Sequence, residues 1–384
     1  MKIIFNKSTV MSAVAPLMCA VSGKSVLSTI EGILIEAKVP DTCVLTTYDL
    51  EKGVRTTIEA KVIEEGSFII NAQKFNQTIR VMGGDEITLT VDDKMSACIS
   101  CGKSSHKMSA LKGEDFPALP DLVSDRSFVI NQAVLKKMIG QVSFAMAVND
   151  QRAVLNGCFF KISDDSLMTV ACDGFKSAKC KRDTELVNKN TNGNDHIDHS
   201  FIVPVKTVND IGKLLSDDEE ALTQIYVTRK HIVFLIGELT FFSRLIDGNY
   251  IDFDRIMIKN HKINISVDKQ VLISALERAA LVTEERIAGS VRSHVRLEIN
   301  DGLLKISATS ASGSTYDEIA VEQEGPDLVI AFNNRFLIDS VRACDADKIK
   351  ISLSSALTSI NIEPCEVEDG VEEIFMILPV RMKD

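Results

Sequence analysis

Apolar and polar residues follow one pattern three times along this chain. Each third opens with a polar residue followed by apolar residues at helical spacing, which predicts an amphipathic helix. Val10, Val134 and Val271 occupy equivalent places in the three openings. The openings are residues 6–22, 131–147 and 268–283.

After each opening helix the apolar residues recur with period two, which is typical of strands with one buried face. An apolar strand then leads directly into a second helix, and a hairpin of two more strands follows. The strand begins Ser-Phe-Ile-Ile in the first third and Ser-Phe-Ile-Val in the second. The strand and helix together span residues 67–82, 200–215 and 328–343.

Each third therefore reads as helix, strands, helix, strands, with about two helices and eight short strands. We expect an α+β protein of three repeated domains, in which two helices pack on antiparallel sheets. Three unrelated α+β domains are the alternative. The same order of elements in every third argues against it.

Length and composition agree with a multidomain globular protein. The chain has 384 residues, of which 45% are apolar and 25% charged, and a length of this size predicts two or three domains. No apolar run reaches the ~18–20 residues that span a bilayer. Residues 1–23 resemble a signal peptide, but polar residues interrupt them and their spacing suits an amphipathic helix better. We expect a cytoplasmic protein with no membrane partner.

The net charge of −11 argues against a protein that coats nucleic acid by bulk charge, although it leaves the distribution open. The six predicted helices carry eleven basic and four acidic residues, a net +7, which leaves −18 for everything else. Ordinary solvent-exposed helix faces are an alternative explanation for the Lys and Arg residues, but such faces would carry Glu as often, because Glu has a similar helix propensity. Only Glu277 appears there, so the helices are the elements that suit a polyanion.

The sequence contains no catalytic or cofactor-binding motif, since we find no phosphate-binding loop, nucleophile elbow or zinc-protease helix. Cys98 and Cys101 form a lone CxxC that we interpret as structural thiols in a strand. His196 and His199 lie in a polar stretch, 186–200, that we interpret as a mobile loop rather than a metal site. The acidic run 217–220 we interpret as solvated. We expect no enzyme activity, no cofactor and no metal.

Several strings in order along the whole chain resemble one family. They are MKIIF at the start, DFPALPDL, FAMAVNDQRAVLNG, LMTVACDG, SRLIDGNYIDFDRI, AFNNRFLIDSV and the terminal ILPVRM. The chain resembles the bacterial sliding clamp, the beta subunit of DNA polymerase III, over residues 1–384. Each string alone would be weak, but their order and spacing over three repeats make the match specific.

The resemblance implies a fold, an assembly and partners. Three clamp-type domains, which we place at 1–124, 125–258 and 259–384, would form half of a ring (the DNA clamp fold). Two chains would join head to tail as a homodimer around double-stranded DNA, with helices lining the hole. Such a clamp does no chemistry. It is a processivity factor that tethers the polymerase III alpha subunit and other polymerases and repair proteins, and a clamp-loader complex opens it.

The resemblance also assigns residues to the hole, where they would contact DNA without reading its sequence. Family members have aromatic residues near 149–154, but Ala153 and Val154 stand there in this chain. The residues assigned to DNA are Lys24, Lys74, Lys136, Lys137, Asn149, Arg152 and Lys206.

A hydrophobic pocket that captures short partner peptides, with a Gln and a Leu/Phe-type end, is a further implication. Burial in the core is the alternative for its apolar residues, but it explains poorly why Arg255 and Arg381 are interleaved with them. The chain departs from the family at Phe175 to Ser177 and at Ile251, so its peptide preference is expected to differ. The pocket residues are Leu155, Cys172, Gly174, Phe175, Lys176, Ile251, Arg255, Ile256, Ile287, Asn333, Phe336, Leu357, Ser359, Met376, Ile377, Leu378, Pro379, Val380, Arg381 and Met382.

For the seam between two chains, the resemblance places the strand 103–111 of the first domain against an edge of the third domain. His106 and Met108 would lie on one side, and Leu281 and Val282 on the other. His106 replaces an aromatic residue of the family, which predicts a looser or pH-sensitive seam.

Two rival functions stay open: a repeat scaffold that binds only proteins, and an enzyme of unknown type. The helix charges argue against the first and the missing motifs against the second.

Overall fold

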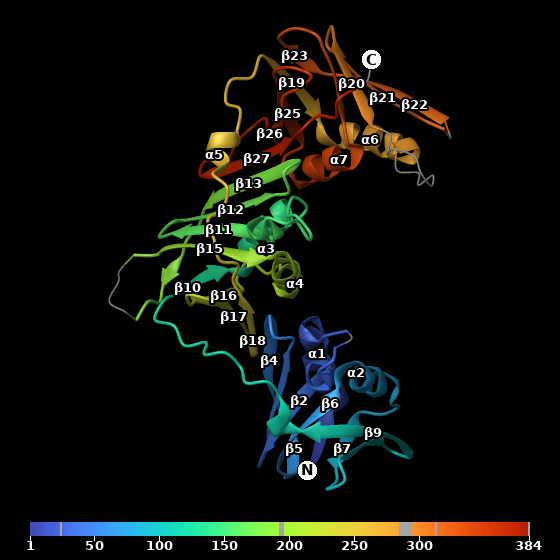
Figure 1. The fold of residues 1–384 in the computed structure, drawn as a ribbon, viewed down its shortest axis with the longest axis vertical. Helices are drawn as coiled ribbons and strands as arrows, with labels where there is room; N and C mark the ends of the chain where they lie inside the picture. Colours follow the sequence, from blue (N-terminus) through green and yellow to red (C-terminus); the bar gives the residue numbers. More distant parts are fainter. Residues whose placement is uncertain (24, 192–195, 284–293, 312, 383–384) are drawn as a thin grey trace. The chain divides into compact units, whose positions relative to one another are not determined.

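The structure is a computed structural model that describes residues 1–23, 25–191, 196–283, 294–311 and 313–382. The described chain forms two compact units. Unit 1 comprises Met1–Ala133, Val187–Asp195 and Lys213–Leu245, and unit 2 comprises Val134–Leu186, His196–Gly212 and Ile246–Asp384. Figure 1 shows the ribbon of the chain with its elements labelled.

The elements recur in the same order three times. The first third contains β1 (Lys2–Asn6), α1 (Lys7–Leu17), β2 (Gly32–Lys38), β3 (Thr42–Tyr48), β4 (Lys52–Glu59), β5 (Lys61–Glu64), β6 (Gly66–Asn71), α2 (Ala72–Val81), β7 (Glu86–Val91), β8 (Ser96–Cys101) and β9 (Ser104–Lys112). The second contains β10 (Ser127–Asn131), α3 (Gln132–Ser143), β11 (Gly157–Ser163), β12 (Ser166–Cys172), β13 (Lys176–Asp183), β14 (Val187–Asn188), β15 (Asp198–Pro204), α4 (Val205–Leu214), β16 (Leu222–Val227), β17 (His231–Ile236), β18 (Leu239–Arg244) and α5 (Phe253–Ile256). The third contains β19 (Ile263–Asp268), α6 (Lys269–Thr283), β20 (Val295–Asn300), β21 (Leu303–Ser310), β22 (Gly313–Ala320), β23 (Glu322–Glu324), β24 (Leu328–Phe332), α7 (Asn334–Ala343), β25 (Lys348–Leu353), β26 (Ile360–Pro364) and β27 (Val371–Ile377).

The six long helices were predicted, but their bounds and the strands before them were not all correct. The opening helices of the first two thirds end at Leu17 and Ser143, earlier than the pattern predicted. The interpretation of the first residues as helical was wrong, because Lys2–Asn6 pairs with β7 and β5 as a strand. The polar stretch 186–200 is not all loop, since it contains β14 and the start of β15.

Asparagine side chains explain where three of the helices begin. Asn6, Asn71 and Asn333 precede α1, α2 and α7, and each side-chain oxygen accepts backbone N–H groups of the first turn. These donors have no partner inside a helix, so a side chain at this position stabilises the helix by about 0.5–2 kcal/mol.

The strands form antiparallel sheets that continue across the thirds. In unit 1 the strand order is β14-β10-β16-β17-β18-β4-β3-β2-β6-β9-β8-β7-β1-β5, so β18 of the second third pairs with β4 of the first. Unit 2 contains the order β15-β11-β12-β13-β27-β26-β25-β19-β23, so β13 pairs with β27. A four-stranded sheet, β22-β21-β20-β24, completes unit 2.

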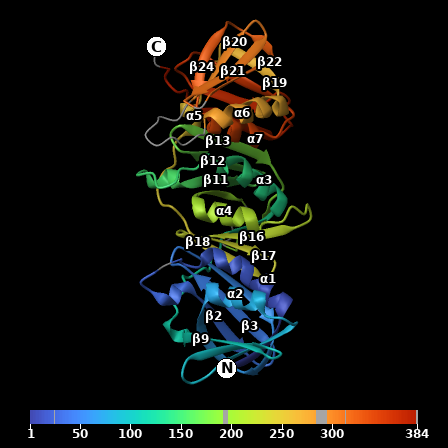
Figure 2. The same ribbon diagram turned by 90° about the vertical axis from the view of Figure 1, so that its right-hand side faces the viewer.

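The longer helices cover one face of the sheets in each unit (Figures 1 and 2). Helix α1 packs beside α2, and α6 beside α7. Helix α4 approaches α3 closely at Gly212, where an added Cβ would lie 3.1 Å from the Ile139 side chain. The largest fully buried side chains are phenylalanines, isoleucines and leucines, for example Phe75 and Phe375. No helix in the described residues is long and apolar enough to cross a membrane.

Candidate functional site

A rigid turn connects β12 to β13 in unit 2. The Asp173 carboxylate accepts the backbone N–H groups of Phe175 at 2.8 Å and Lys176 at 2.9 Å, and Gly174 has a φ of +91°, which favours glycine. The Phe175 side chain is therefore held outward, with the residue 64% exposed. An exposed aromatic ring on a rigid turn is a suitable contact for a partner chain.

Lys176 connects this turn to α7. The residue is 8% exposed, and its ammonium group pairs with Asp173 and lies 4.5 Å from the centre of the Phe336 ring. A buried ammonium needs such partners, because an isolated charge is costly to remove from water. The contact positions Phe336 beside the start of β13.

The chain end continues the same surface. The backbone N–H of Leu378 donates to the Phe175 carbonyl at 2.8 Å, and that of Val380 donates to the Ala331 carbonyl at 2.8 Å. Leu378, Val380 and Met382 keep 37–41% of their surface exposed. The residues after β27 therefore lie between the 173–176 turn and β24.

Beneath the turn is a small apolar cluster. Leu155 and Cys172 are buried there with Ala147, and Tyr250 and Ile251 pack against them. Burial raises the pKa of the Cys172 thiol, so this thiol is protonated and a poor nucleophile at neutral pH.

The predicted pocket residues thus divide by burial, and the structure brings many of them together in unit 2. Ile287 lies outside the described residues. The buried members are Leu155, Cys172, Lys176, Ser359, Met376 and Ile377. The half-buried ones are Ile251, Asn333, Phe336 and Pro379, and the exposed ones are Gly174, Phe175, Arg255, Ile256, Leu357, Leu378, Val380, Arg381 and Met382. The pocket assignment itself stays a prediction.

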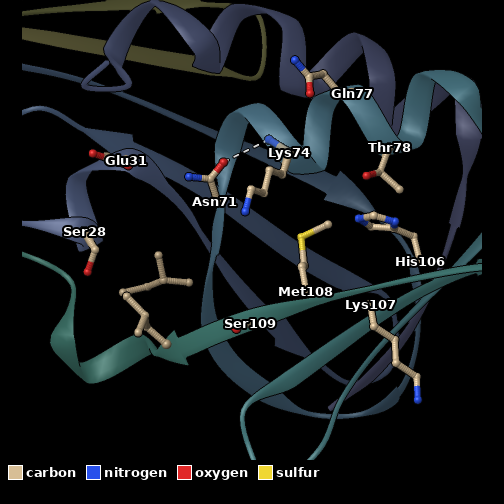
Figure 3. Close-up of a pocket in the computed structure, with 12 residues that line it drawn as sticks. Ser28, Glu31, Asn71, Lys74, Gln77, Thr78, His106, Lys107, Met108 and Ser109 are labelled. Carbon is tan, nitrogen blue, oxygen red and sulfur yellow. Dashed lines mark hydrogen bonds between the residues drawn. The ribbon is translucent and has the colours of Figure 1, made fainter. Parts of the chain in front are cut away.

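A second feature is a cavity in unit 1 between α2 and β9, with a volume of ≈ 650 Å³. Figure 3 shows Lys74 of α2 and Met108 of β9 extending into the space between the two elements, whereas Lys107 points away. His106, expected at the seam, also lines this cavity. Lys74, which was assigned to DNA from the sequence, thus also lines the cavity that contains the seam residues.

The edge of β9 is open beside this cavity. The strand pairs with β8 from Ser104 to Ser109, but with β6 only from Ala110 to Lys112. In the part of the chain that the structure describes, the second edge of residues 104–109 therefore has no strand partner. In unit 2, Leu281 is 80% exposed near the end of α6, and Val282 is half-buried beside it.

Fewer of the basic side chains on the helices are available to bind a polyanion than their number suggests. With the observed bounds, the six helices of ten or more residues carry eleven basic and three acidic residues. At least four of these cations form ion pairs within the described residues, which reduces the charge that these helices present. The pairs are Lys137 with Asp345, Arg278 with Asp317, Arg335 with Asp339, and Arg342 with Glu277.

The other residues assigned to DNA are mostly exposed. Arg152 makes two hydrogen bonds of 3.0 Å to Asp150, and the side-chain bond lowers the pKa of Asp150 to about 2. Asn149 is exposed with a φ of +60°. Lys206 is exposed on α4 and Lys136 is half-buried on α3. Lys24 lies outside the described residues.

Comparison with known proteins shows which family has this sequence and fold. Models of the DNA polymerase III beta subunit match in order: the N-terminal domain at residues 1–120, the central domain at 129–252 and the C-terminal domain at 254–380. The chain belongs to the DNA polymerase III beta subunit family.

Individual relatives agree. The beta sliding clamp of Staphylococcus aureus strain Mu50 is 28% identical over 372 residues, which cover 94% of each chain. A putative DNA polymerase III beta subunit from Eubacterium rectale is 27% identical with a TM-score of 0.89, and all of both chains is covered. The DNA polymerase sliding clamp of Bacillus subtilis, at 24% identity and a TM-score of 0.90, shares the fold over the full length of both chains.

Membership in the beta subunit family confirms the predicted fold class, with three clamp domains of helices and antiparallel sheets. The chain is a DNA polymerase processivity factor and not an enzyme, since the family is non-catalytic. DNA and polymerase partners follow from the family.

The remaining side chains with metal-binding chemistry do not converge. Among the described residues no group of three or more His, Cys, Asp or Glu could hold a metal ion. His196 lies 2.8 Å from Asp164, and Cys98 and Cys101 lie on strand β8 as free thiols. Sequence reasoning missed Lys179 of β13, a buried lysine whose partners come from distant segments.

Proposed function

We propose that two copies of this chain close into a homodimeric ring around duplex DNA. The match of three clamp-domain models in order over residues 1–380 carries the proposal. We place the domain boundaries at 1–124, 125–258 and 259–384; the matched ranges support three domains in this order, although the C-terminal match begins at residue 254. The native mass of the chain, with and without nicked circular DNA, tests the ring: a mass of one chain under all conditions would refute it.

The seam of this ring would join β9 of one copy to β22 of the other. Both strands have an open edge in the described chain, and pairing would close both. The charges are complementary in sign, because β9 carries Lys107 and β22 carries Glu318 as well as Asp317, which already pairs with Arg278. Leu281 of the second copy would then fill space in the cavity beside Met108.

DNA contacts would come from the helix side of the ring, through the residues assigned from the sequence: Lys24, Lys74, Lys136, Lys137, Asn149, Arg152 and Lys206. Contacts of this kind weaken steeply with salt, because bound cations are released from DNA. Since Lys137 and Arg152 already have acidic partners, we expect Lys206 to contribute more than either.

A loading assay on nicked circular DNA tests these contacts. The triple change of Lys136, Arg152 and Lys206 to Glu should shorten retention at low salt, whereas Lys230→Glu, in the exposed turn between β16 and β17, should not. Native mass measured in parallel separates loss of the ring from loss of DNA contact. Equal retention of an intact triple-variant ring would refute the assignment.

The surface around Phe175, Phe336 and the chain end would bind short peptides of partner proteins. These partners are the polymerase III alpha subunit, the clamp-loader complex and other polymerases and repair proteins. The support is an apolar floor, exposed apolar rims and a few oriented polar groups, which is the usual form of such sites.

We place the protein in the cytoplasm, where replication factors of bacteria act.

Fluorescence anisotropy with a labelled peptide that carries a Gln and a Leu-Phe end tests the pocket. Binding that an excess of unlabelled peptide displaces would support it. No binding at micromolar protein would refute it.

A further inference from the structure

Strand β13 carries two buried lysines that face opposite sides of its sheet. Lys176 and Lys179 are 8% and 7% exposed, and residues three apart in a strand point to opposite faces. Lys176 meets Phe336 of α7, whereas Lys179 meets α5. Figure 1 shows α5 and α7 on opposite sides of β13 and β27.

The ammonium group of Lys179 joins three segments. It donates to Asp254 Oδ1 of α5 at 3.1 Å and to Glu372 Oε1 of β27 at 3.0 Å. It also lies 6.0 Å from the centre of the Phe253 ring. Burial lowers the pKa of Lys179, but the hydrogen bonds to the two carboxylates raise it above its ordinary value overall. The group is therefore charged at neutral pH.

The aliphatic part of Lys179 lies among apolar neighbours. Val170 and Ile374 are directly opposite it on the two adjacent strands, and both belong to a buried cluster with Phe253. A long lysine side chain commonly buries its methylenes in this way while its charged end finds partners. Replacement by methionine would keep most of this packing and remove only the charge.

Helix α5 depends on these contacts for its position. It has four residues and no side-chain cap, and a single isolated turn is not stable in water. The flanking Ile251 and the α5 residues Arg255 and Ile256 belong to the proposed peptide pocket. Whatever holds α5 against the sheet therefore sets one wall of that pocket.

We propose that Lys179 is a positioning residue of the peptide pocket, which holds α5 against β13 and β27 and thereby fixes the wall formed by Ile251, Arg255 and Ile256. The inference rests on the proposed peptide-binding function. Its electrostatic basis is that two carboxylates share one cation. Without the cation, Asp254 and Glu372 face one another as like charges and push α5 away from β27.

The test measures the affinity of the labelled peptide with a Gln and a Leu-Phe end for the full-length protein at two salt concentrations. Lys179→Met should weaken binding roughly 5- to 10-fold at ~0.05 M NaCl and less than about 2-fold at ~0.5 M, since salt screens repulsion between exposed carboxylates. Lys179→Arg, which keeps the charge, should stay within about 2-fold of the unchanged protein at both.

A second substitution separates this repulsion from lost packing. Asp254→Asn should weaken binding about 2-fold in the unchanged protein, because a tether is lost, and strengthen it in the Lys179→Met background, because the repulsion is lost. Asp254 has a side chain that is 64% exposed, so this variant is expected to fold. Such a reversal of sign would not arise from packing alone.

Lys348→Met is the matched control, because Lys348 pairs with Glu322 at 2.7 Å on the surface of the same unit. It should leave the affinity unchanged. If the unchanged protein does not bind the peptide, the proposed function of the pocket fails. If it binds, but Lys179→Met binds equally well or loses the same factor at both salt concentrations, the positioning role of Lys179 is refuted.

Discussion

The proposed peptide pocket of unit 2 and the cavity of unit 1 both contain a lysine, but the two lysines have different surroundings. In the pocket Lys176 is 8% exposed and has a carboxylate and an aromatic ring as partners. In the cavity Lys74 is exposed on α2, and the space of ≈ 650 Å³ that it lines lies beside an open strand edge.

The difference shows what each region needs in order to bind. In the proposed pocket the charge of Lys176 is satisfied within one chain, so this part would be organised before a short peptide arrives, which would lower the entropy cost of binding. The cavity adjoins an unpaired strand, so a second folded chain with its own strand edge would complete it. One region suits exchangeable peptides and the other suits a lasting interface.

The largest expected effect concerns the floor of the pocket. Leu155 is 1% exposed, so Leu155→Ala should lower the free energy of unfolding of unit 2 by about 2–5 kcal/mol, as measured by hydrogen exchange of amides in β11–β13. Leu357→Ala is the control, because Leu357 is 72% exposed, and its effect should be below about 0.5 kcal/mol. Equal effects would show that the floor is not part of a core.

A smaller loss is expected where the peptide would touch the pocket. Phe336→Ala should weaken peptide binding by about 1–3 kcal/mol, since it removes apolar surface and the partner of the Lys176 ammonium. Anisotropy with the labelled peptide measures this. Tyr316→Ala removes a 59% exposed ring from β22 and should leave peptide binding unchanged. Unaltered binding by Phe336→Ala would place the peptide elsewhere.

A substitution in the cavity of unit 1 should weaken the dimer and leave peptide binding unchanged. Met108→Ala should weaken the dimer by about 1–2 kcal/mol, because Met108 would contact the second chain through its thioether and methylenes. Sedimentation equilibrium measures the dimer constant. Peptide affinity of the same variant serves as the control and should not change. A dimer of unchanged strength would remove Met108 from the seam.

The smallest expected effect is a gain in the stability of unit 2. Ser177 is fully buried, and its hydroxyl has no hydrogen-bond partner among the described residues. Ser177→Ala should therefore raise the free energy of unfolding of unit 2 by up to about 1 kcal/mol. Hydrogen exchange of β13 measures it, and a loss of stability would indicate that the hydroxyl is satisfied.

The sequence predicted the helices well because their apolar spacing extends over ten or more residues. It did less well with short strands such as β1 and β10, where five residues offer little periodicity. Segment 263–268 alternates clearly and could have been predicted. The strand 103–111 was placed within one residue of β9, Ser104–Lys112.

The candidate site likewise contains residues that the sequence pointed to and residues that it did not. Phe175 and the chain end were assigned to the pocket from strings that resemble a family, and this assignment stays a prediction. Lys179 could not, because its partners lie 75 and 193 residues away along the chain and nothing near it marks it as paired. The position of Lys74 in the cavity likewise depends on the distance between α2 and β9, which helical spacing alone cannot show.

The long pairing of β13 with β27 has a mechanical consequence. Seven successive residue pairs, from Lys176 opposite Ile377 to Arg182 opposite Val371, join the two strands. A pull on the chain end along the strand direction would load these hydrogen bonds together, because they run across the strands. If a moving polymerase is held near Leu378, as proposed, its pull would load this ladder in shear, so that several hydrogen bonds would have to break together.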